Sequence, residues 1–118
     1  MPHEQKHISI VFFRMHSGIE PVRQWLLTLP PQDRKTIGVD LMKVEFGWPI
    51  GMPVCRPLGQ GLWEVRSNLP SGRIARVLFC MTDGDMYLLN GFIKTTQKTP
   101  PKELTIARSR QAEVMRNE

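Results

Sequence analysis

The chain has 118 residues, of which 41% are hydrophobic and 23% are charged, a balance typical of a soluble globular protein. Its length fits a single domain, residues 1–118, with a core that needs no disulfide or metal. A formal net charge of +5 and a pI near 9.7 favour a polyanionic partner. No apolar run approaches the roughly 20 residues that span a bilayer, so we expect a cytoplasmic protein that does not bind membranes.

The first half of the chain predicts one strand followed by two helices. Residues 8–14 (ISIVFFR) form an apolar run rich in β-branched and aromatic side chains, which is typical of a buried strand. Apolar residues then recur at helical spacing over residues 19–29. Pro30 and Pro31 end this first helix and begin a second, which Gly47 stops. Two short helices joined at a double proline predict a helical hairpin packed on a sheet.

The second half predicts a loop, three strands and a last helix. Residues 47–61 are rich in glycine and proline, which indicates an irregular loop. Three strands connected by two tight turns follow, at residues 62–69, 73–82 and 86–94. Thr99 is placed to cap a helix that continues to the C-terminus. The predicted fold is α+β: a mostly antiparallel four-stranded sheet with an N-terminal helical hairpin and a C-terminal helix.

Basic side chains recur along the three predicted strands. Alternation places Glu64 and Arg66 on one face of their strand, and Arg76 on the corresponding face of the next. We expect this face to lie opposite the helices and to remain polar and basic, with Lys94 near the two arginines. A phosphate backbone binds such a surface. The alternative is that each arginine is only a solvated strand residue.

Three segments of the chain resemble HigB-like toxins of the RelE/ParE superfamily: LWEVR at 62–66, RIARVLF at 73–79 and LLNGFIKTTQKTPPKELTIAR at 88–108. The most specific element is a run within the third segment, made up of Gly91, Phe92, Lys94, Lys98, Thr99 and Pro100. The similarity extends over the preceding helices and so over nearly the whole chain. It implies a RelE/ParE-like fold and a toxin of a type II toxin–antitoxin pair. Such toxins usually cleave mRNA on the translating ribosome and are neutralised by a small antitoxin protein.

RNA cleavage without a metal or cofactor needs a base for the ribose 2′-hydroxyl, cations for the charge on phosphorus and an acid for the leaving oxygen. Arginine suits the second role because its planar fork holds two phosphate oxygens. We therefore predict Arg76 and Arg66 as phosphate clamps. Lys94 is a candidate for proton transfer, and Glu64 is either the base or the ion-pair partner that orients Arg66. Further RNA contacts are expected from Arg73, Lys98 and Arg56.

The sequence does not identify the acid and base securely. His3, His7 and His16 all lie near the N-terminus, away from the predicted strands of the site. Tyr87 is the only tyrosine, and alternation places it on the face opposite Lys94.

Two other functions remain open at this point. One is a ParE-like inhibitor of DNA gyrase, which would share the fold without being a nuclease. The other is a phage or regulatory protein that binds nucleic acid without catalysis. Cys55 and Cys80 have neither metal-ligand spacing nor a disulfide framework, so we expect free thiols.

Overall fold

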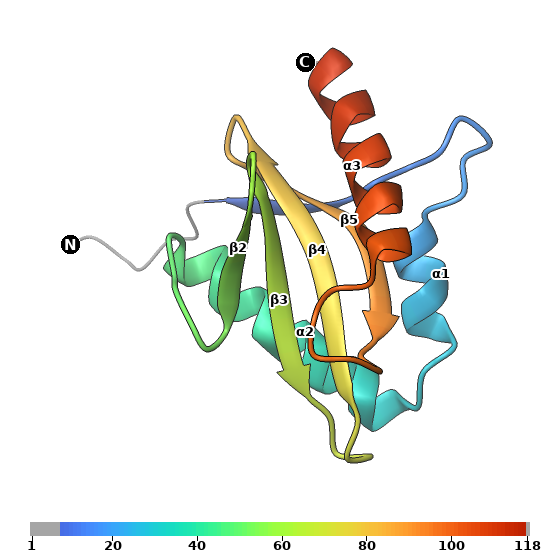
Figure 1. Ribbon diagram of the computed structural model, residues 1–118, viewed down its shortest axis with the longest axis vertical. Coiled ribbons are helices and arrows are strands. Elements are labelled where there is room, and N and C mark those ends of the chain that lie inside the picture. Colours follow the sequence, from blue (N-terminus) through green and yellow to red (C-terminus); the bar gives the residue numbers. More distant parts are fainter. Residues whose placement is uncertain (1–7, 118) are drawn as a thin grey trace.

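A computed structural model describes residues 8–117 of the chain. Within this range, strands form one sheet and helices cover both of its faces (Figure 1). The elements in chain order are β1 (Ser9–Phe12), α1 (Pro21–Leu27), α2 (Pro31–Gly47), β2 (Cys55–Gly59), β3 (Leu62–Asn68), β4 (Ile74–Thr82), β5 (Asp85–Ile93) and α3 (Pro101–Arg116). The predicted α+β class is confirmed.

The sheet has five strands in the order β1-β5-β4-β3-β2. β1 pairs parallel to β5, and the other neighbours are antiparallel. The prediction of four strands is therefore wrong, because part of the expected loop at 47–61 is the edge strand β2. Its sequence, CRPLG, does not read as a strand because it contains a proline. An edge strand tolerates proline, because one side of its backbone needs no hydrogen-bonded neighbour.

α1 and α2 cover one face of the sheet, where Ile37 and Val44 of α2 pack in a core with Val65, Val77 and Phe79. The expected helical hairpin is not formed. α1 is only 7 residues long and packs mainly on β5 and β1, whereas α2 packs mainly on β3. The two helices follow one another in the chain but lie on different strands.

α3 packs against the other face, which we expected to be polar and basic. Leu78 and Leu89 of the sheet form a second core there with Ala107 and Val114 of α3. The prediction is thus wrong for much of this face, since the apolar stripe of α3 needs a covered surface. The basic side chains occupy the remainder, toward the turn between β3 and β4.

A β-bulge in β5 changes which side chains face α3. Leu78 pairs with Asn90, but the next residue of β4 pairs with Leu88, so Leu89 is an extra residue in the ladder. The alternation of β5 therefore shifts by one position between its two ends. Tyr87 packs in the core under α3, on the same face as Phe92 and, two residues on, Lys94. The predicted placement of Tyr87 on the opposite face from Lys94 is wrong for this reason.

Candidate functional site

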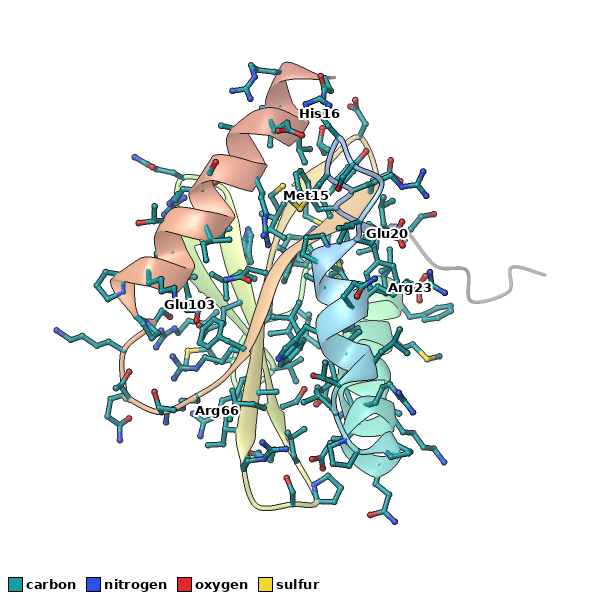
Figure 2. All side chains as sticks on the ribbon, turned by 90° about the vertical axis from the view of Figure 1, so that its right-hand side faces the viewer. Met15, His16, Glu20, Arg23, Arg66 and Glu103 are labelled. Atoms are coloured by element: carbon teal, nitrogen blue, oxygen red, sulfur yellow. The ribbon has the colours of Figure 1, made fainter. Side chains whose placement is uncertain are left out.

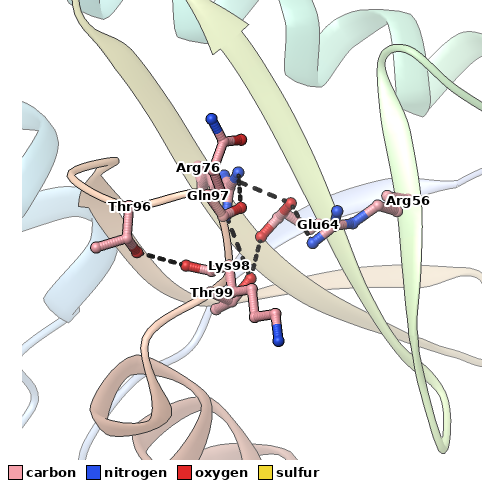
Figure 3. Close-up of polar contacts among 7 residues, drawn as sticks. All are labelled: Arg56, Glu64, Arg76, Thr96, Gln97, Lys98 and Thr99. Carbon is pink, nitrogen blue, oxygen red and sulfur yellow. Dashed lines mark hydrogen bonds and ion pairs between the residues drawn. The ribbon is translucent and has the colours of Figure 1, made fainter.

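Glu64 is a buried carboxylate at the centre of a group of charged side chains (Figure 3). Its Oε1 atom lies 3.6 Å from Nη2 of Arg56 and 3.6 Å from Nε of Arg76. Its Oε2 atom accepts a hydrogen bond of 2.8 Å from the hydroxyl of Thr99. Glu64 is an ion-pair partner, as one of the two predictions had it, but it pairs with Arg56 and Arg76 rather than with Arg66. We call these four residues, Arg56, Glu64, Arg76 and Thr99, the Glu64 cluster.

Arg76 is only 3% exposed, although its strand position suggested a solvent-facing side chain. Its Nη2 donates to the carbonyl of Gln97 at 3.0 Å, and its Nη1 donates to Oγ1 of Thr99 at 3.4 Å. Nε is buried and has no hydrogen-bond acceptor among the described residues; Glu64 approaches it only to 3.6 Å. The guanidinium is therefore held in place but not fully satisfied.

The charges around Arg76 oppose one another. Burial lowers the pKa of Arg76, the carboxylate of Glu64 raises it, and Arg56 and Arg66 lower it further. Arg66 is exposed and stands directly opposite Arg76 in the register of β3 and β4. Like charges directly opposite on a sheet destabilise it. An anion bound between these two arginines would relieve that repulsion.

The segment between β5 and α3 covers Arg76 and changes the role of Thr99. α3 begins after Pro100, without a side-chain cap, so the predicted capping by Thr99 is wrong. Its hydroxyl instead bridges Glu64 and Arg76. Lys98 is exposed beside it, with its carbonyl accepting a 2.7 Å hydrogen bond from Thr96.

Lys94 lies just past the end of β5, where its backbone N–H donates to the carbonyl of Ile74 at 2.7 Å. Its half-buried side chain shares a face of the sheet with Arg76. Of the predicted catalytic residues, Arg66, Arg76, Glu64 and Lys94 thus lie on one part of one face. Their catalytic roles stay predictions.

A groove of about 730 Å³ opens beside the cluster. The ladder between β2 and β3 ends where Cys55 pairs with Val65, and one more backbone hydrogen bond joins Arg66 to Val54. Beyond Arg66, β3 has an open edge with α2 next to it, and the groove forms there. Arg56, Glu64, Arg66 and Arg76 line the groove on the side of the sheet. Side chains of α2, including Lys35 and Lys43, line the other side; the sequence interpretation missed them because they read as an ordinary solvated helix face.

Arg73, predicted as an RNA contact, lies outside the groove. Its Nη2 is 3.4 Å from Oδ2 of Asp33, a buried carboxylate in the first turn of α2. Asp33 also accepts a hydrogen bond of 3.3 Å from the backbone N–H of Ser71. Arg73 therefore holds the turn between β3 and β4 against α2.

The remaining candidates for acid–base chemistry are His3, His7, His16 and Tyr87. His3 and His7 lie outside the described residues, and the other two are distant from the Glu64 cluster. The side chain of His16 is 94% exposed and lies 3.9 Å from Glu113 of α3. Figure 2 shows it at the opposite end of the molecule from Arg66. Tyr87 lines a second cavity, of about 400 Å³, between β1, β5 and the end of α3. Among residues 8–117, the carboxylate of Glu64 is the group with base chemistry at the arginines.

Within residues 8–117, no three His, Cys, Asp or Glu side chains are grouped so that they could hold a metal ion. None of the helices in that range is long and apolar enough to cross a membrane. Cys55 and Cys80 are buried, and neither forms a disulfide.

Residues 24–112, well over half of the chain, match the family described as phage derived protein Gp49-like (DUF891). No functionally curated protein matches the chain significantly. The family match supports the resemblance to the wider toxin superfamily without singling out HigB. The chain therefore belongs to the Gp49-like family of phage-derived proteins, a RelE/HigB-like toxin family of toxin–antitoxin systems.

Proposed function

We propose that this protein is the toxin of a type II toxin–antitoxin pair and that it cleaves mRNA on the translating ribosome without a metal ion. Membership of a RelE/HigB-like family supports the toxin role and a protein antitoxin as partner. The observation that carries the nuclease activity is the Glu64 cluster: a buried carboxylate flanked by arginines at the edge of a basic groove.

The cluster has the groups that the first step of RNA cleavage needs. Glu64 takes the proton of a ribose 2′-hydroxyl, whose oxygen then bonds to the adjacent phosphorus. Arg66 and Arg76 stabilise the extra negative charge on the phosphate oxygens. The bond from phosphorus to the 5′-oxygen breaks, and a proton from Lys94 completes the new 5′-hydroxyl. The products are a 2′,3′-cyclic phosphate and a 5′-hydroxyl end.

Arg66 gives a cleaner test than Arg76. Removal of the buried Arg76 would leave Glu64 with a weaker set of partners, at a cost in stability of up to about 3–5 kcal/mol. Arg66 is exposed, and its replacement changes stability by no more than about 0.5 kcal/mol. Loss of one charge-stabilising donor lowers a cleavage rate by about 10²–10³-fold.

The experiment compares Arg66→Ala with wild type after induced expression in a bacterial host, with the 5′ ends of cellular mRNA mapped. Arg116→Ala is the matched control, because Arg116 is an exposed arginine at the far end of α3. We expect new 5′ ends inside translated codons for wild type and the control, and their loss for Arg66→Ala.

Other outcomes would point to the competing functions. Growth arrest with intact mRNA and DNA damage would favour a gyrase inhibitor. Binding of RNA without any cleavage would favour a non-catalytic nucleic-acid-binding protein. If folded Arg66→Ala cleaved mRNA as fast as wild type, the assignment of the site would be wrong.

A further inference from the structure

We infer that α2 forms the second wall of an RNA-binding groove, in which Lys35 and Lys43 hold phosphates of the strand that reaches the Glu64 cluster. This inference rests on the proposed function and names where the substrate lies. It assigns RNA contacts to a helix whose outer face, from sequence alone, reads as solvated surface.

The charges of the groove favour an anionic occupant. Basic side chains come from both walls, and they outnumber the acidic ones: Lys35, Lys43, Arg56, Arg66 and Arg76 against Asp40 and Glu64. Glu64 is already matched by Arg56 and Arg76. Asp40 lies 3.2 Å from the ammonium of Lys43.

Several donors in the groove have no protein partner. Among residues 8–117, neither Lys35 nor Arg66 forms an ion pair, so both ammonium and guanidinium are open to a ligand. At the inner end, the Nε atom of Arg76 is buried without a hydrogen-bond acceptor. A buried donor without an acceptor is unfavourable, because it has lost its contact with water and gained no other partner. A phosphate group that approaches Arg66 would lie next to this Nε atom of Arg76.

The groove also has an apolar part, which favours single-stranded RNA over a simple polyanion. Val39 of α2 is 46% exposed and Met52 of the following loop is 72% exposed, and both line the groove with Pro53 and Val54. Unpaired bases need such surfaces, because their faces pack on apolar or aromatic groups when they leave the stack. The lysines and the apolar residues therefore fit two different parts of the same nucleotide chain.

The groove lies next to the residues to which we assign RNA cleavage. Arg66 and Arg76 belong both to the groove lining and to the surroundings of Glu64. A strand whose scissile phosphate lies between the two arginines continues along the open edge of β3, where α2 is the neighbouring element. Lys35 and Lys43 are then its next cationic contacts.

The test measures binding of a short, unstructured, fully 2′-O-methylated RNA, which has no free 2′-hydroxyl and cannot be cleaved. Wild type is compared with Lys35→Gln/Lys43→Gln and with Arg23→Gln/Arg116→Gln, a control pair on α1 and α3 that removes the same charge. Each phosphate contact to a single strand contributes about 0.7 to the slope of log affinity against log salt. We expect the α2 variant to lose about 1.4 from this slope and, at low salt, on the order of tenfold in affinity.

Asp40→Asn gives a change of the opposite sign. It removes an acidic group from the groove and releases Lys43, so it should tighten RNA binding several-fold, whereas a purely structural role for α2 predicts no gain.

The possible results separate this inference from the proposed function. If wild type cleaves mRNA in cells but the α2 and control variants have the same salt slope, RNA does not lie along α2, and the inference is wrong while the proposed function stands. If the α2 variant binds RNA normally but no longer binds the antitoxin, the groove holds an acidic protein segment instead. If wild type neither binds RNA nor cleaves mRNA, both proposals fail.

Discussion

Arg76 illustrates how one side chain can be both structural and poised for a ligand. In the free protein, two of its three guanidinium nitrogens donate to the segment that covers it, at Gln97 and Thr99. The third, Nε, has only the distant carboxylate of Glu64. A phosphate that binds here must therefore share these donors with the protein or displace the covering segment. The burial that lowers the pKa of Arg76 also strengthens any charge interaction that it makes.

Thr99→Val tests how much the hydroxyl contributes to the Glu64 cluster. The substitution keeps the shape of the side chain but removes the hydroxyl that donates a hydrogen bond to Glu64 and accepts one from Arg76. It should lower the free energy of unfolding by about 1–3 kcal/mol, because both partners are buried. Thr28→Val, which removes an exposed hydroxyl bonded to a backbone carbonyl, should cost about 0.5 kcal/mol or less. Urea denaturation compares the two, and equal costs would mean that the cluster is not held by Thr99.

Gly91, part of the motif behind the family resemblance, has a packing explanation. A Cβ atom at this position would lie 2.5 Å from two ring carbons of Trp25, which packs over β5 from α1. Gly91→Ala should therefore destabilise the protein by about 1–3 kcal/mol through overpacking. Gly38→Ala is the control of opposite sign: its Cβ meets nothing within 4 Å, and a helical alanine gains up to about 1 kcal/mol. If Gly91→Ala had the same melting temperature as wild type, the explanation by close packing against Trp25 would be wrong.

At the level of elements, the sequence predicts what has a clear period and misses what depends on neighbours. The strands at 62–68 and 74–82 and the buried stripe of α3 are found because their patterns repeat. β2 escapes because CRPLG has no alternation, and it is a strand only through its pairing with β3. The bulge at Leu89 escapes because an extra residue in a ladder leaves no mark in an apolar run.

In the site, too, the sequence predicts what is local to one strand and misses what depends on neighbouring elements. Alternation correctly groups Arg66, Arg76 and Glu64 on one face, since each position is local to its strand. It cannot show that Arg76 is buried, because the covering residues come from the segment before α3. The groove is missed for a similar reason: it exists only because β2 starts at Cys55 and leaves the last residues of β3 beside α2.

β2 also gives a pH prediction, through Cys55 at its start. Burial, with the charge of Glu64 adding to it, raises the pKa of the Cys55 thiol from 9.0 to about 11. In the unfolded chain the thiol loses its proton first, so stability should fall as pH rises from about 9 to about 11, by up to about 3 kcal/mol in total. Below pH 9 this contribution is fully present.

Urea unfolding over this alkaline range measures the slope. Cys55→Ala should flatten it, even though the lost packing shifts the whole curve downward. Cys80→Ala is the matched control, because Cys80 is also a buried cysteine that forms no disulfide. A slope that survives in Cys55→Ala would assign the alkaline sensitivity to another group.

For the whole molecule, charge is separated between two ends. The groove beside α2 is basic. The cavity between β1, β5 and α3 is acidic, because it is lined by one cation, Arg14, and four carboxylates, those of Glu20, Asp83, Asp85 and Glu113. Such a separation orients a protein as it approaches a polyanion, with the basic end foremost. The net charge, which is known from the sequence, does not show how the charges are distributed between the two ends.

The order of the strands has a consequence for how the protein is made. Of the strands within residues 8–117, β1 is synthesised first, but its partner is β5, the last of them. The Glu64 cluster likewise draws on β2, β3 and β4 and is complete only with Thr99. A nascent chain therefore carries the arginines of the site long before it can arrange them, because contacts so distant in sequence form late. Under the proposed function, this delay protects the ribosome that is making the toxin, because the site is incomplete until the segment with Thr99 has been synthesised.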